Sequence, residues 1–178
     1  MLPYLRAIRQ RTSLAICSGN HDVLPQRGFD TAQWMQPLRD EGIHIDGDDF
    51  WFCDYRFRCI GWCDPVPASQ EPWSDFWVMH APPYGARTSM VRGGISHGDE
   101  EARDVCLAGG GPLITLGGHV HWPIEFWDVL HETITLNPGK GDNFECPNHI
   151  VVDMTNHRMA HHYDTELGMM QAELKFIA

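Results

Sequence analysis

Short apolar runs separated by polar turns dominate this chain, and three of the runs end at a polar segment that contains histidine. The runs cover residues 14–17, 76–79 and 112–117, and the polar segments that follow them are 18–22, His80 and 118–121. Apolar runs of this length, bounded by Gly and polar residues, are typical of buried strands. We therefore expect three strands whose ends bring these polar side chains to one edge of a sheet.

The remaining pattern predicts a mixture of helices and strands. Helical spacing of apolar positions and capping residues predict helices over 2–10, over 31–39 with Asp30 as N-cap and an end at Gly42, and over 99–107. Alternation predicts antiparallel strands over 43–45, 50–52 and 55–61, and further strands over 75–79, 124–130, 132–136 and 149–153. The Gly-rich segment 86–97 is expected to be a mobile loop.

Composition limits the class of protein. The 178 residues, 43% of them hydrophobic, suit one domain over 1–178 with a sizeable core. The start lacks the apolar core of a signal peptide, no run reaches the length of a membrane span, and the six Cys contain no Cys-x-x-Cys pair. We therefore expect a cytoplasmic protein with reduced thiols and no membrane partner. A net charge of −11, with 13 unclustered Lys and Arg, argues against a nucleic-acid partner.

The histidine-bearing segments are the candidate chemistry. His119 and His121 would point to the same side of an extended chain, and Gly118 would allow a close approach of the backbone to a ligand. Each motif alone is more often structural, because Gly-Asn is ordinary turn chemistry and a His-x-His pair is often a packed one. With Asn20 and His80 at neighbouring strand ends, the set indicates metal ligands. Imidazole suits Zn, Fe and Ni, whereas amide and carboxylate oxygens also admit Mn.

In this order, and with Asn137-Pro138-Gly139 following, the motifs resemble those of the calcineurin-like metallophosphoesterase family. The later blocks of that family read Gly-Asn-His-Asp, a lone His and Gly-His-x-His. The resemblance implies an α/β fold in which two mixed β-sheets pack face to face and are flanked by helices. It also implies two divalent metal ions (Mn, Fe, Zn or Ni) that hydrolyse a phosphomonoester or phosphodiester substrate, roughly 3.5–4 Å apart in the general two-metal scheme.

The resemblance also assigns roles to residues. Carried over position by position, the metal ligands fall on Asn20, His80 and His119 for one ion and on His121 for the other. His21 would protonate the leaving oxygen or stabilise the charged phosphate, and Asp22 would orient His21. Bound metal would lower the pKa of water towards about 7, and proton transfer by His21 would add a factor of about 10²–10⁴.

The chain departs from the family at its beginning. The opening blocks Asp-x-His and Gly-Asp are absent, and only 18 residues precede Gly19. We therefore expect an N-terminally incomplete domain that lacks its first strands, with impaired activity unless the missing ligands are encoded upstream or supplied by another chain. Exposed sheet edges would favour a homo-oligomer.

Two readings from different classes remain open. The first is the phosphoesterase, and the second is a non-catalytic interaction module that retains the fold. A purely structural metal protein is disfavoured, because Asn20 is a poor structural ligand and the chain has no Cys cluster. For Tyr84 and Trp122 the sequence leaves substrate contact and core packing equally open, and Arg87 and Arg92 are more often solvated than bound to phosphate.

Overall fold

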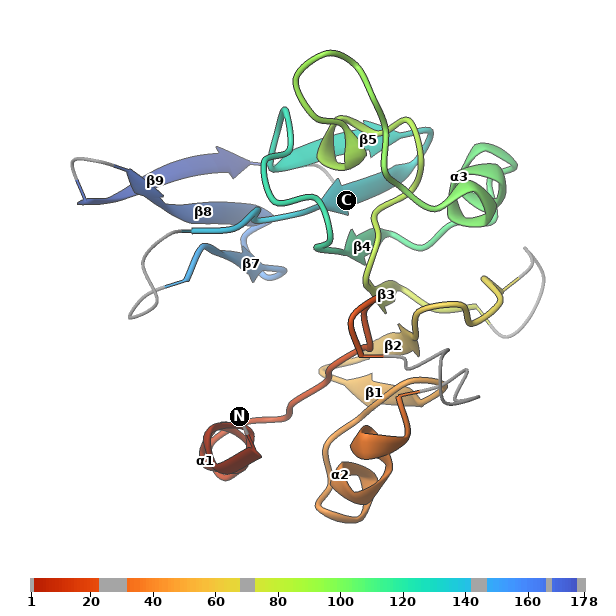
Figure 1. Cartoon of the computed structure of the whole chain (residues 1–178), viewed down its shortest axis with the longest axis vertical. Helices are drawn as coiled ribbons and strands as arrows, with labels where there is room; N and C mark the ends of the chain where they lie inside the picture. The colour runs from red at the N-terminus through yellow and green to blue at the C-terminus, as the bar shows by residue number, and fades with distance from the viewer. Residues whose placement is uncertain (1, 23–31, 68–72, 142–146, 166–167, 176–178) are drawn as a thin grey trace.

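The protein is a mixed α/β structure built on two sheets (Figure 1). The computed structural model describes residues 2–22, 32–67, 73–141, 147–165 and 168–175. Its helices are α1 (Leu2–Arg9), α2 (Gln36–Asp40) and α3 (Glu100–Leu107), with 3₁₀ turns η2 (Gln33–Met35) and η3 (Arg87–Ser89). Its strands are β1 (Asp49–Phe52), β2 (Tyr55–Ile60), β3 (Phe76–Met79), β4 (Ile114–Leu116), β5 (Trp127–Leu130), β6 (Thr133–Leu136), β7 (His149–Asp153), β8 (Arg158–Thr165) and β9 (Gly168–Lys175).

The larger sheet has six strands in the order β1-β2-β3-β4-β6-β5. Its four central strands, β2, β3, β4 and β6, run parallel, and β1 and β5 pair antiparallel at the two edges. The carboxyl ends of parallel strands meet at one edge of a sheet, which is where ligands bind in many α/β proteins. The segments that begin at Gly61, His80, Gly117 and Asn137 therefore start from the same edge.

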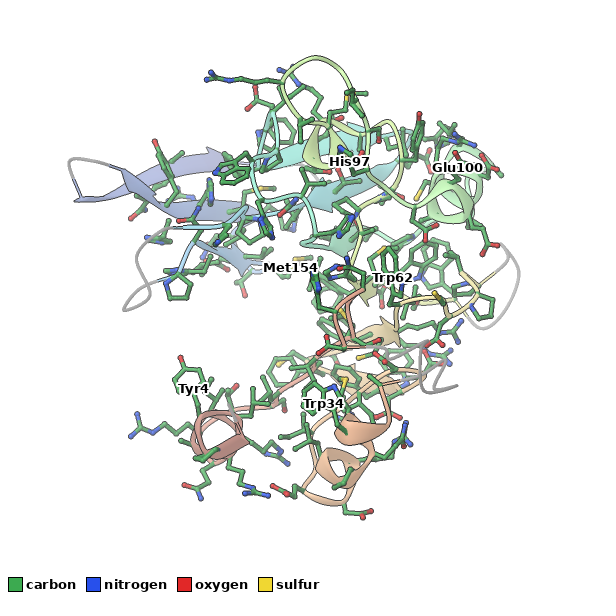
Figure 2. The ribbon with its side chains drawn as sticks, viewed as in Figure 1. Tyr4, Trp34, Trp62, His97, Glu100 and Met154 are labelled. Carbon is green, nitrogen blue, oxygen red and sulfur yellow. The ribbon has the colours of Figure 1, made fainter. Side chains whose placement is uncertain are left out.

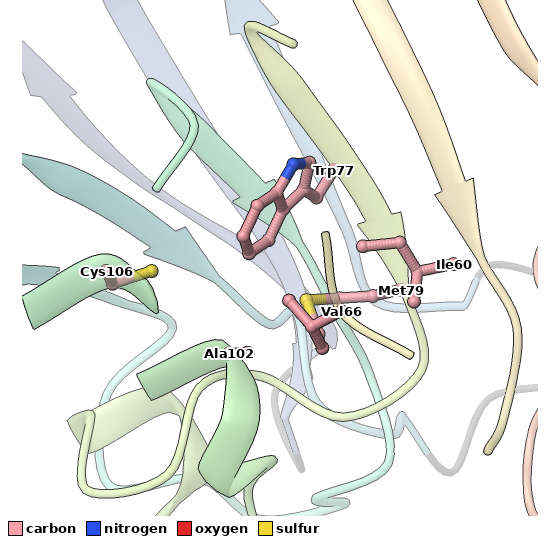
Figure 3. Close-up of a cluster of buried hydrophobic side chains, with 6 residues drawn as sticks. All are labelled: Ile60, Val66, Trp77, Met79, Ala102 and Cys106. Carbon is pink, nitrogen blue, oxygen red and sulfur yellow. The ribbon is translucent and has the colours of Figure 1, made fainter. Parts of the chain in front are cut away.

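Side chains that alternate along β3 separate the two faces of this sheet. Trp77 and Met79 pack with Ala102 and Cys106 of α3 (Figure 3). Phe76 points to the opposite face and packs with Met159 of β8. The second sheet, β7-β8-β9, therefore lies against the face of the first sheet that α3 leaves uncovered. The three strands of this second sheet pair antiparallel, whereas a mixed sheet was expected.

A third cluster of buried side chains lies beside the sheet, where α1 and α2 meet two extended segments. Met35, Leu38, Ile43 and Ile45 are its buried members, and Leu14 packs against them. The run 14–17, predicted to be a strand, forms a single parallel bridge from Ala15 to His44. The prediction that 43–45 is an antiparallel strand is wrong, because this segment pairs in parallel with the run before Asn20.

Most predicted elements are confirmed. The structure contains the helix near the start, the helix over 100–107 with the Asp99 carboxylate as its N-cap, and the strands at β1 to β7. The predicted helix over 31–39 is found as η2 and α2, while its proposed cap Asp30 lies outside the described residues. The segment 86–97 contains η3 and a hydrogen bond from His97 N to Ser89 O, so it has regular turns where an irregular loop was expected.

The hairpin of β8 and β9 was missed. Residues 168–175 read Gly-Met-Met-Gln-Ala-Glu-Leu-Lys, which is rich in helix formers, so local propensity argues against the strand. Packing of Met159 into the main core overrides that preference. The described cysteines are free thiols. None of the described helices combines the length and the apolar character that a membrane crossing requires.

Candidate metal centre

Three of the four predicted metal ligands meet at one point beyond the ends of the parallel strands. Nε2 of His80 lies 2.9 Å from Oδ1 of Asn20 and 3.0 Å from Nδ1 of His119. These residues are 60 and 39 positions apart in the sequence, so only the fold brings them together. Nε2 carries at most one hydrogen and can donate well to only one of the two facing atoms.

The spacing of these atoms suits a shared metal ion. Nitrogen and oxygen ligands bind metals such as Zn at about 2.0–2.2 Å, so neighbouring donors on one ion lie roughly 3 Å apart. The two distances around His80 Nε2 have that value. Two imidazoles and one amide oxygen are a chemically reasonable but incomplete donor set, because none of them carries a negative charge. Within the described ranges, no three His, Cys, Asp or Glu side chains are grouped closely enough to hold a metal by themselves.

Gly19 is required by the close approach of the His80 ring. A Cβ atom added to Gly19 would stand 2.6 Å from Cε1 and 2.7 Å from Nδ1 of His80, which is inside van der Waals contact. Gly118 has more room, since its added Cβ would come no closer than 3.7 Å, to the backbone oxygen of His80. The sequence therefore identified the wrong glycine as the point of closest approach.

The segment of His119 and His121 is a turn, so the prediction of an extended strand there is wrong. His119 has a left-handed backbone with φ of 60°, and Val120 N donates to Gly118 O at 2.6 Å. Because the chain turns, Val120 points into the protein and is 4% exposed, His119 is partly buried and His121 is exposed. His119 faces His80, whereas His121 packs edge-on against the Trp122 ring, with centroids 5.7 Å apart.

Asn137 fixes this turn. Its buried side-chain amide donates to the backbone oxygens of Thr88 and Val120, each at 3.0 Å, and its Oδ1 accepts from Gly139 N at 2.9 Å. These bonds tie the end of β6 to the turn at His119 and to η3. The Asn-Pro-Gly segment that accompanies the histidine motifs is therefore a structural support of the turn.

The local field keeps the central histidine neutral. Burial lowers the pKa of His80 to about 4, and positive charge on His119 would lower it further. Burial also lowers the pKa of His119, followed in effect by His97 and His121. Both imidazoles are therefore neutral near pH 7, which is the form that donates a lone pair to a metal.

Carboxylates lie beneath the centre that the sequence did not identify. Asp46 Oδ1 accepts from Ser18 N at 2.8 Å, and Asp64 Oδ2 accepts from Gly61 N at 3.0 Å. Both carboxylates come within 2.8 Å of the point where a Cβ on Gly61 would stand. Burial, and then the nearby charges of Asp64 and Asp22, raise the pKa of Asp46 against the lowering effect of its hydrogen bonds with Ser18.

Trp62 is a second contributor that sequence reasoning missed. It follows β2, is labelled in Figure 2, and packs its ring 5.4 Å from the His80 ring and 5.5 Å from the His119 ring. Its backbone N–H donates to the Ser18 hydroxyl at 2.9 Å. Trp62 therefore shields the two imidazoles from solvent while it anchors the segment before Asn20.

The predicted proton-transfer residues lie on the turn that follows Asn20. His21 is exposed, and Asp22 Oδ2 accepts from Gly19 N at 2.9 Å, which closes the turn. In the described part of the chain Asp22 thus has a printed bond to Gly19 and none to His21. Arg87 is engaged elsewhere, since its guanidinium pairs with Glu125 at 2.9 Å, and Tyr84 lies under the Arg103 guanidinium.

Comparison with known proteins gives no match: no family model, curated protein or solved structure is significantly similar to this chain.

Proposed function

We propose that this chain is a calcineurin-like metallophosphoesterase, that is, a metal-dependent enzyme that hydrolyses phosphomonoesters or phosphodiesters. The observation that supports the proposal most is the convergence of Asn20, His80 and His119 with donor spacings of 2.9 and 3.0 Å. The order of motifs and the position of the centre at the carboxyl ends of parallel strands agree with it. His121, on the next turn, is the candidate ligand for a second ion.

Each residue has a distinct part in the proposed mechanism. Asn20, His80 and His119 would hold the first ion, and their lack of negative charge would leave the ion's charge to attract phosphate. A bound divalent ion supplies an activated water and neutralises charge on the phosphoryl oxygens. His21, exposed beside Asn20, is free to give a proton to the leaving oxygen. Trp62 would exclude water from the inner side of the two imidazoles.

A second candidate function is a non-catalytic module with the same fold. It is favoured by one observation, namely that the described His, Cys, Asp and Glu side chains include no group of three that could hold a metal. A weak metal site would then be a remnant, and the surface would bind a protein or ligand without hydrolysis. The two functions differ in metal uptake and in turnover.

The test is a calorimetric titration of the purified chain with Mn²⁺ and Zn²⁺, followed by hydrolysis of bis(4-nitrophenyl) phosphate and 4-nitrophenyl phosphate. The variant is His119→Gly, because glycine tolerates the left-handed backbone at this position. The matched control is His131→Gly, at an exposed His with φ of 58° that lies far along the chain from the ligands.

We expect metal binding and turnover in the wild type and in His131→Gly, and at least a tenfold loss of metal affinity in His119→Gly. Metal binding without turnover would favour the non-catalytic module. Absence of metal binding by the wild type, or equal turnover in the two variants, would contradict the proposed phosphoesterase.

A further inference from the structure

An open groove begins at His121 and runs to the second sheet. It has a volume of about 1200 Å³ and lies between the segment after the His119 turn, the residues after β6, and strands β8 and β9 (Figure 1). A smaller hollow of about 320 Å³ contains both His119 and His121 and shares Lys140 with the groove. The metal centre and the groove are therefore continuous through His121.

The groove carries positive charge in a protein whose net charge is −11. Arg92 and Lys140 line it, and neither has an ion-pair partner among the described residues. The groove's acidic residue Glu125 is already paired, with the Arg87 guanidinium at 2.9 Å. The free charges therefore favour an anionic ligand beside His121.

The groove also offers flat aromatic surfaces. Trp122 is 67% exposed and stands edge-on to His121. Farther along, the rings of Phe126, His161 and Tyr163 form a continuous series with centroid distances of 4.4 and 5.0 Å. Nε2 of His161 is bonded to Pro138 O at 2.9 Å, so this series is fixed in place. An exposed Trp beside such a series is suited to stacking against a planar ring.

We propose that the groove binds a phosphate ester whose organic part carries a planar ring, as in a nucleoside phosphate or an aryl phosphate. Arg92 and Lys140 attract the phosphate, and Trp122 stacks on the ring. This inference deepens the proposed phosphoesterase function and rests on it for the statement that the ligand is a substrate. Binding of the ligand in the groove does not require metal and is tested separately.

The first experiment measures binding to the metal-free protein in EDTA by calorimetry. The probes are AMP, phenyl phosphate and ribose 5-phosphate, so that the nucleoside, the simple aryl group and the ring-free sugar are compared. We expect AMP to bind about tenfold or more tightly than ribose 5-phosphate, the size of effect that one base–aromatic stack gives. AMP binding without phenyl phosphate binding would identify the nucleoside source, and equal binding of both would identify ring stacking alone.

The variants separate stacking from charge. Trp122→Ala is expected to remove the preference for AMP, and Trp122→Phe to retain most of it. Trp51→Ala is the matched control, because Trp51 is 69% exposed but lies on edge strand β1, at the opposite end of the sheet from β5. Lys140→Gln should weaken all three probes several-fold, whereas Arg11→Gln, at an exposed residue after α1, should weaken none.

The outcomes distinguish this inference from the proposed function. Binding of AMP that depends on Trp122, in a protein without turnover, would contradict the phosphoesterase and leave the groove as a ligand site. Turnover with no preference for a ring, equal losses in Trp122→Ala and Trp51→Ala, or no binding of any probe would overturn the groove proposal.

Discussion

Replacing Gly19 with alanine tests how tightly the candidate centre is packed. The added methyl would stand 2.6 Å from Cε1 of His80, about 1 Å inside normal contact between carbon atoms. The imidazole cannot retreat freely, because Nε2 is held 2.9 Å from Asn20 Oδ1 on one side and 3.0 Å from His119 on the other. We expect Gly19→Ala to displace the ring by about 1 Å and to destabilise the protein by about 1–3 kcal/mol, the usual cost of overpacking.

Gly118→Ala is the matched control for this prediction. Gly118 also adjoins His80, but its added Cβ would be 3.7 Å from the nearest atom, which is an ordinary contact. Neither glycine has a positive φ, so the comparison measures space alone. Urea unfolding would give the free energies, and Mn²⁺ titration would report the position of the His80 ring. Equal stability and equal metal affinity in the two variants would refute the reasoning.

Two further predictions concern pH and the core. Because the pKa of His80 is about 4 in the folded protein and about 6.5 when unfolded, protonation favours unfolding as pH falls below about 6.5. Discounted for partial exposure, we expect about 1 kcal/mol of stability to be lost between pH 7 and pH 5, less in His80→Gln and unchanged in His131→Asn, by urea unfolding at each pH. The Thr115 hydroxyl is buried without a hydrogen-bond partner among the described residues, whereas Thr135 Oγ1 lies 2.9 Å from Thr88 Oγ1. Thr115→Val should therefore raise the melting temperature and Thr135→Val should lower it by about 1–2 kcal/mol equivalent, and a change of the same sign in both would contradict this account.

Local signals in the sequence were enough to predict most elements of the main sheet. The apolar runs at β3 and β4 are short and bounded by Gly or polar residues, so their burial follows from composition alone. The helix at α3 begins at an Asp cap and ends before Gly109, which are local signals as well. The strand β9 has no such signal, because its residues favour a helix and only contact with β8 makes it a strand.

The tertiary structure decided which side chains form the candidate centre. The order of the histidine motifs predicted that Asn20, His80, His119 and His121 share a strand edge, and parallel pairing of β2, β3 and β4 brings the first three together. The sequence could not predict the turn at His119, because its left-handed backbone depends on hydrogen bonds from the distant Asn137.

The sequence by itself determined the type and order of the polar groups at the ends of the strands, because these depend on neighbours along the chain. Trp62, Asp46 and the groove at Trp122 could be found only in the folded protein. Their positions depend on contacts between residues tens of positions apart, such as the bond from Trp62 N to the Ser18 hydroxyl. No local pattern specifies such contacts, since they are selected by the packing of the whole sheet.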